Sequence, residues 1–123
     1  EKIMGAIEKP TPSIVLMKAF DNACNELGVN RVNKSKILGV NASTLSRKSG
    51  IGFPPQSKTG ELQLHFIRLY RSLFAISGGD KEFMSHWYST MNNDLHGTPM
   101  DLCQSIRGLF SVNQYLDAMR GKI

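Results

Sequence analysis

The chain has 123 residues, of which 41% are hydrophobic and 20% are charged, and its net charge is +5 at pH 7. This balance excludes a disordered chain and predicts one folded domain, or two small subdomains that share a core. No apolar run reaches the roughly 18 residues of a membrane span, and no segment has the layout of a secretion signal, so we expect a soluble, cytoplasmic protein without a membrane partner.

The first part of the chain predicts an arm followed by a helix. Residues 1–13 contain two prolines and no periodicity, so we expect a flexible arm, and a chain that does not begin with Met suggests trimming or a missing leader. From residue 14 to residue 27, apolar residues recur every three or four positions, which indicates a helix with one buried face. Ser13 and Gly28 are its expected caps.

Two short helices are predicted next, joined by a glycine corner. Asn30 can cap a helix over residues 31–38, and Gly39 can end that helix in a left-handed turn. Asn41 can cap a second helix over residues 42–48. Two short helices with this connection are typical of a helix-turn-helix, so residues 14–59 are predicted to form a DNA-binding region of that kind.

The charge of the chain supports this interpretation. The window from Leu27 to Gly60 contains six basic residues and no acidic one, which leaves nine basic residues against ten acidic ones in the remainder. A solvated surface usually mixes both signs. The window therefore indicates a face that binds a polyanion, although an ordinary helical hairpin with a solvated surface is the alternative.

The second short helix also has an unusual composition. Its Ser, Thr and Asn side chains weaken a helix interior, but they suit the first turns of a helix that enters the major groove of DNA. Lys48 stands three residues after the inward-facing Leu45, where an apolar residue is usual, and Phe53 could supply the missing contact. The predicted DNA-binding residues are Arg31, Lys34, Asn41, Ala42, Ser43, Thr44, Ser46, Arg47 and Lys48.

The second half of the chain is predicted to contain a long helix and three shorter ones. After a linker over residues 49–59, a wide apolar stripe over residues 60–77 indicates a long helix, whose several apolar faces make it the candidate dimer interface. Asp80 can cap a helix over residues 81–90, in which Phe83, Met84 and Trp87 are expected to be buried. For Tyr88, on the adjacent face, the pattern does not decide between burial and exposure.

A loop over residues 91–97 precedes the last two predicted helices. Thr98 and the Pro that follows it predict a helix start, with an end near Ile106. Ser111 and Gln114 form a capping-box pattern that predicts a final helix to Arg120. No alternating strand pattern is visible, so the predicted fold class is all-α.

No residue pattern predicts catalysis, a cofactor or a metal site. Cys24 and Cys103 lie far apart in the sequence and are expected to be buried thiols. The three histidines, His65, His86 and His96, lack the spacing of helical metal ligands. Because no phosphate loop, nucleophile elbow or nucleophile–base pair is recognisable either, we expect a protein that is not an enzyme.

Taken together, the two halves resemble the Xre/MbcA/ParS antitoxin family, whose members are partners of RES-domain toxins. LGVNASTLSR, residues 38–47, is similar to the Xre-type helix-turn-helix, a motif that many repressors share. More specific is the ordered combination of the Trp87 helix, the loop LHGTPMDL at residues 95–102, Gly108, and the segment from Val112 to Leu116. The resemblance extends from about Phe20 to the end of the chain. Tyr88, Lys48 and the segment GLFSVNQYLD depart from the family pattern.

The resemblance implies an antitoxin that represses its own operon and blocks the active-site entrance of a toxin acting on NAD. Residues 60–123 would then form a helical dimerization and toxin-binding region, and a chain cut after Gly108 is expected to stay folded but lose neutralization. Gly97 and Pro99 would have structural roles. The resemblance places these residues against the toxin: Gly108, Leu109, Phe110, Tyr115, Met119, Arg120, Lys122 and Ile123.

The sequence leaves two other functions open. One is a plain dimeric helix-turn-helix regulator of transcription without a toxin partner. The other is a protein inhibitor whose helix-turn-helix has lost DNA binding. The antitoxin and the plain regulator would both bind DNA. For either of them, specific repression would require a homodimer that reads two half-sites of an operator, about one turn apart.

Overall fold

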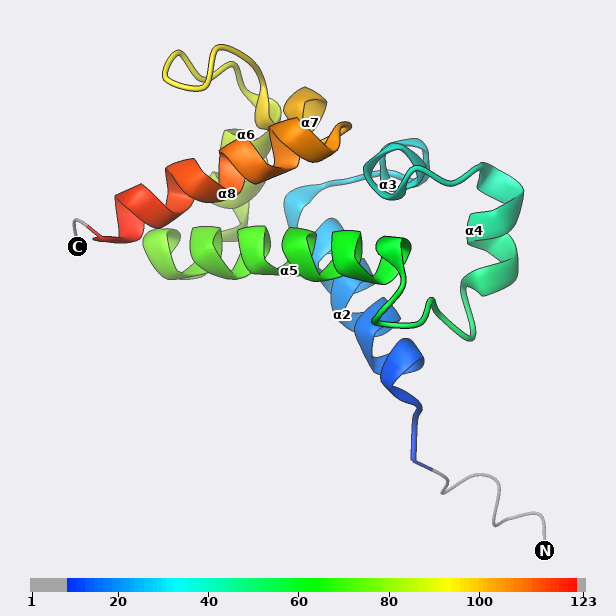
Figure 1. Ribbon diagram of the computed structural model, residues 1–123. Coiled ribbons are helices and arrows are strands. Elements are labelled where there is room, and N and C mark those ends of the chain that lie inside the picture. Colours follow the sequence, from blue (N-terminus) through cyan, green and yellow to red (C-terminus); the bar gives the residue numbers. More distant parts are fainter. Residues whose placement is uncertain (1–8, 122–123) are drawn as a thin grey trace, which may run out of the picture.

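The computed structural model describes residues 9–121, and these residues form helices joined by turns and loops, as Figure 1 shows. Within this range no strand is present, and the bridge between Asn92 and Gly97 is an isolated one. The predicted all-α class is therefore confirmed. The helices are α2 (Pro12–Leu27), α3 (Arg31–Leu38), α4 (Ala42–Lys48), α5 (Lys58–Ser77), α6 (Lys81–Ser89), α7 (Pro99–Leu102) and α8 (Ile106–Gly121).

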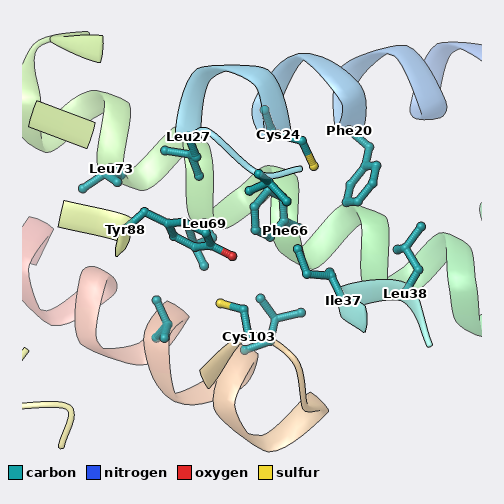
Figure 2. Close-up of a cluster of buried hydrophobic side chains, with 14 of the residues drawn as sticks. Phe20, Cys24, Leu27, Ile37, Leu38, Phe66, Leu69, Leu73, Tyr88 and Cys103 are labelled. Carbon is teal, nitrogen blue, oxygen red and sulfur yellow. The ribbon is translucent and has the colours of Figure 1, made fainter. Parts of the chain in front are cut away.

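The long helix α5 is the centre of the fold. Helices α2 and α8 pack along it, α6 packs against α2, and α7 lies between α6 and α8. One hydrophobic core joins these helices, and aromatic rings from three of them meet within it, as Figure 2 shows. Phe66 of α5 contacts Phe20 of α2 and Tyr88 of α6 edge to face, with ring centroids 5.6 and 5.8 Å apart. The core thus runs across the predicted boundary near residue 59, and the division into regions stays a prediction.

The start of α2 differs from the sequence prediction. The helix begins at Pro12, and the side chain of Thr11, not Ser13, accepts a hydrogen bond from the backbone N–H of Ile14 at 3.2 Å. A Pro is favourable at the first helical position because it has no backbone N–H, and an N–H at that position would have no partner within the helix. The predicted arm was therefore too long at its C-terminal end, and residues 1–8 lie outside the described part of the chain.

The buried face of α6 also differs. Met84 and Tyr88 are fully buried, whereas Phe83 is 45% exposed and Trp87 is only partly buried, with its ring stacked on Tyr115. The apolar residues of this helix form two adjacent stripes, and helical periodicity cannot choose between them. The contact of Tyr88 with Phe66 on α5 decides the choice.

The last two helices begin and end elsewhere than predicted. Helix α7 ends at Leu102, and α8 begins at Ile106, so that Ser111 lies inside a helix instead of capping one. The hydroxyl of Ser105 caps α8 by accepting a hydrogen bond from the N–H of Gly108 at 3.0 Å. Thr98 precedes Pro99 at the start of α7, but its side chain makes no capping hydrogen bond.

Cys24 and Cys103 are free thiols that are both buried in the core, as the sequence indicated. Burial raises the pKa of each to about 12, because the interior disfavours the charged thiolate. Both side chains are therefore neutral and unreactive at neutral pH. No helix within residues 9–121 is long and apolar enough to cross a membrane.

Candidate DNA-binding and partner-binding surfaces

The α3–α4 pair has the two helices and the corner that the sequence predicted. The side-chain oxygen of Asn30 accepts a hydrogen bond from the N–H of Asn33 at 2.9 Å, and that of Asn41 accepts from the N–H of Thr44 at 2.8 Å. Gly39 ends α3 in the left-handed region, with φ of 67°, where a residue with a Cβ would be strained. Leu45 is buried. Local sequence therefore sets where both helices begin and where α3 ends.

Residues along α4 present a polar outer face. Five of the predicted DNA-binding residues at this helix are exposed, whereas Thr44 and Lys48 are partly buried. Arg47 donates a hydrogen bond to the hydroxyl of Thr44 at 3.2 Å, within its own helix, so its guanidinium group can turn outward at little cost. Phe53 of the linker is buried, as expected of a residue that supplies the apolar contact missing at Lys48. The five exposed residues are Asn41, Ala42, Ser43, Ser46 and Arg47.

The two predicted DNA-binding residues of α3 already have partners within the chain. Arg31 donates hydrogen bonds to the hydroxyl of Ser46 and to the carbonyl of Ala42, and so links the start of α3 to α4. Lys34 lies 3.0 Å from the carboxylate of Asp21 on α2, and its side chain is only 19% exposed. Both side chains therefore position the pair, and a phosphate would compete with the contacts that they make.

The residues predicted to contact a toxin fall into two groups on α8. Gly108 and Leu109 are buried, whereas Phe110 is 57% exposed and Met119 is 37% exposed. Arg120 is exposed and donates a hydrogen bond to the hydroxyl of Ser72 at 3.2 Å. Only the outer group can contact a partner while α8 stays packed. Lys122 and Ile123 lie outside the described residues.

The aromatic residue Tyr115 lies between two elements of the C-terminal half. Its ring stacks on Trp87 with centroids 6.3 Å apart, and its hydroxyl donates a hydrogen bond to the carboxylate of Asp94 at 3.1 Å. It is partly buried. Tyr115 thus ties α8 to α6 and to the loop over residues 91–97.

An apolar patch at the start of α8 was only partly predicted, because the sequence prediction named Phe110 but not Ile106. Ile106 is 71% exposed and Phe110 is 57% exposed, and both line a small pocket of about 60 Å³ with Leu62 and His65 of α5. The two residues stand four positions apart, which places them on one side of a helix. The spacing could have been read from the sequence, but the predicted helix start at Ser111 placed both residues outside the final helix.

Helix α8 belongs to the core and is not a detachable tail. Leu109, Val112 and Leu116 are all buried in the core cluster. Deleting the chain after Gly108 would remove these three side chains, each worth roughly 1.5–3 kcal/mol when fully buried. A truncated chain is therefore expected to unfold, so loss of neutralization by that chain would not identify the binding site. Substitutions of exposed residues are needed instead.

A comparison with protein families identifies the class of the C-terminal half. Residues 72–122, from the end of α5 through α8, match the antitoxin Xre/MbcA/ParS C-terminal toxin-binding domain. The class that this match defines is an antitoxin, which acts by binding a toxin and is non-enzymatic, as the sequence predicted. No curated protein matches the chain.

Residues 72–122 are thus similar to the C-terminal toxin-binding domain of the Xre/MbcA/ParS antitoxin family, and this match covers less than half of the chain. The resemblance stated for this half of the sequence is thereby confirmed. The match begins at residue 72, so the α3–α4 pair lies outside it. The matched domain is a toxin-binding one, and it therefore implies a toxin partner.

Proposed function

We propose that this protein neutralizes a RES-domain toxin that consumes NAD, by occluding the entrance to the toxin's active site, and that it represses its own operon as a homodimer. The observation that carries the proposal is the match of residues 72–122 to a toxin-binding domain. The RES type of the toxin and the autorepression come from the resemblance of the sequence to the family. They are therefore the parts that experiment has to test.

Occlusion requires only a rigid surface that fills the entrance. Helix α8 is held in place by its buried side, and its outer side offers exposed apolar residues, among them Phe110. A helix that is already ordered loses little conformational entropy when it binds a partner. An inhibitor of this kind needs no catalytic group, which agrees with a family that is non-enzymatic.

Replacing Phe110 with Ala is expected to weaken neutralization without changing stability. The ring is 57% exposed, so its removal costs the fold little, whereas loss of a large aromatic anchor from an interface commonly costs about 2 kcal/mol, or roughly a 30-fold loss of affinity. The measurement is the amount of antitoxin needed to halve NAD consumption by the purified toxin of the same operon.

The matched control for this test is Val32→Ala, because Val32 is an apolar residue of α3, 62% exposed and outside the matched domain. Val32→Ala should neutralize as the unaltered protein does. If Phe110→Ala neutralizes as well as the unaltered protein, Phe110 is not part of the toxin-binding surface. If the unaltered protein does not inhibit the toxin, the proposed neutralization of a RES-type toxin is wrong.

Operator binding by the α3–α4 pair is the second half of the proposal. The acid-free window and the exposed polar face of α4 support it. A single pair of short helices covers only a half-site, so a dimer is expected, and the exposed Leu64 and Phe74 on α5 support a dimer contact there.

Arg47→Ala is expected to weaken operator binding by about 1–3 kcal/mol, because Arg47 is the exposed cation of α4 that can reach guanine. Binding is measured to operator DNA over a series of salt concentrations, since phosphate contacts make affinity fall steeply with salt. Lys18→Ala, on α2 and outside the basic window, removes the same charge and should have little effect. Absence of operator binding even at low salt would indicate a protein inhibitor without DNA binding.

Affinity capture separates the antitoxin from a plain regulator. The protein is captured from a nuclease-treated lysate of its own organism, and bound proteins are identified with their stoichiometry. One tight partner that consumes NAD when it is released agrees with the proposal. Recovery of the protein alone, as a dimer that binds its promoter, would favour the plain regulator.

A further inference from the structure

An open groove of about 690 Å³ lies between α5 and the C-terminal end of α8. Three arginines from the two helices surround an apolar floor that Leu64 and Ile67 of α5 provide. The position of the helices is fixed by a hydrogen bond of 3.1 Å from the side-chain amide of Asn113 to the carbonyl of His65. The arginines of the groove are Arg68, Arg71 and Arg120.

The groove has an excess of positive charge. Arg68 forms an ion pair with Asp117, and Arg120 donates a hydrogen bond to the neutral hydroxyl of Ser72. Within residues 9–121, Arg71 forms neither an ion pair nor a side-chain hydrogen bond. One carboxylate therefore faces three guanidinium groups. Guanidinium groups bind carboxylates in a two-pronged geometry, so a surface of this kind favours an acidic ligand.

The groove crosses the edge of the family match. Arg120 belongs to the matched domain, whereas Arg68 and Arg71 precede residue 72. The groove is therefore continuous with the toxin-binding domain and extends it onto α5.

We propose that this groove binds an acidic segment of the toxin, which presents carboxylates to Arg71 and Arg120 and an apolar side chain to the floor. This inference rests on the proposed antitoxin function. It extends the toxin-binding surface beyond residues 72–122 and gives that extension a chemical preference.

A second copy of the chain fits this groove poorly. In a symmetric dimer the same surface meets itself, so groove against groove would bring the arginines of one copy toward those of the other. A neighbouring groove of about 480 Å³ between α2 and α5 is lined mainly by apolar residues, among them Pro12 and Val15. It shares Leu64, Ile67 and Arg71 with the first groove, but neither Arg68 nor Arg120 lines it. That surface suits a second copy better.

The test compares charge reversals at two exposed positions. Arg71→Glu reverses a charge in the groove, and Lys18→Glu makes the same change on α2, outside both grooves. The probe is the purified toxin of the same operon, and affinity is measured at low and high salt. Arg71→Glu should weaken binding at least about tenfold at low salt, with a smaller difference at high salt. Lys18→Glu should change affinity by less than about threefold.

The outcomes separate this inference from the proposed function. If the unaltered protein does not bind the toxin, the proposed function fails, and the inference fails with it. If the unaltered protein binds but Arg71→Glu binds equally well, only the inference is overturned. Because Arg71 also lines the neighbouring groove, the inference is likewise overturned if Arg120→Glu, at a position that lines this groove and not the neighbouring one, binds the toxin as the unaltered protein does.

A photo-crosslinker attached to Ile67→Cys provides a second measurement. The side chain of Ile67 forms part of the floor, so the crosslinker reaches what occupies the groove. An acidic toxin peptide is the expected product. A basic toxin peptide, or no toxin peptide at all, would contradict the proposal.

Discussion

Gly108→Ala is expected to destabilise the protein by at least about 3 kcal/mol, a large part of the 5–15 kcal/mol that stabilises most domains. A Cβ at this position would lie 1.8 Å from the carbonyl oxygen of Leu102 and 2.5 Å from its carbonyl carbon. Both atoms belong to the backbone of α7, so no side chain can rotate to make room. Helices α7 and α8 would have to separate, and Leu109 would lose its place in the core.

The matched control is Gly121→Ala in the same helix. A Cβ there meets no atom within 4 Å, so the substitution should be neutral or stabilising by up to about 1 kcal/mol. Urea unfolding followed by circular dichroism measures both variants. Equal unfolding midpoints for the two would mean that α7 does not pass α8 as closely as the structure has it.

Tyr88→Ala is expected to cost about 3–5 kcal/mol, whereas Tyr88→Phe should change stability by about 1 kcal/mol or less. The ring of Tyr88 is completely buried against Phe66. Its hydroxyl points toward Cys103, as Figure 2 shows, but it makes no hydrogen bond within the described part of the chain. Removing the ring leaves a large cavity, while removing the hydroxyl relieves an unsatisfied polar group.

Thermal and urea unfolding of the two variants separate these contributions. A Tyr88→Phe variant that lost as much stability as Tyr88→Ala would mean that the hydroxyl has an essential partner. Because Tyr88 packs α6 of the toxin-binding domain against α5, Tyr88→Ala should also lose neutralization, but only in proportion to the fraction of protein that unfolds.

Both predictions concern the support of α8, on which the proposed inhibition depends. The exposed Phe110 and Arg120 can form the proposed binding surface only while the buried side of the helix holds them in place. Stability variants are therefore expected to affect neutralization and operator binding together. The variants Phe110→Ala and Arg47→Ala should affect one activity each, because these two side chains are exposed and lie on different helices, α8 and α4.

The sequence by itself determined the features that depend on neighbouring residues. The caps Asn30 and Asn41 and the turn at Gly39 were predictable because each satisfies backbone groups a few positions away. The resemblance of the C-terminal half was also evident from sequence, since its motif residues recur in a fixed order. The DNA contacts proposed for α4 stay predictions.

Only the tertiary structure decided the features that depend on which helix packs against which. Periodicity left two apolar stripes on α6, and the contact with Phe66 placed Tyr88 inside. A Gly inside α8 weakened the sequence signal for a helix, although the close passage of Leu102 is what requires it. Lys34 acquired a partner in Asp21, which lies outside the acid-free window of the sequence. In each case the deciding energy comes from contacts between residues distant in the chain, which no local pattern contains.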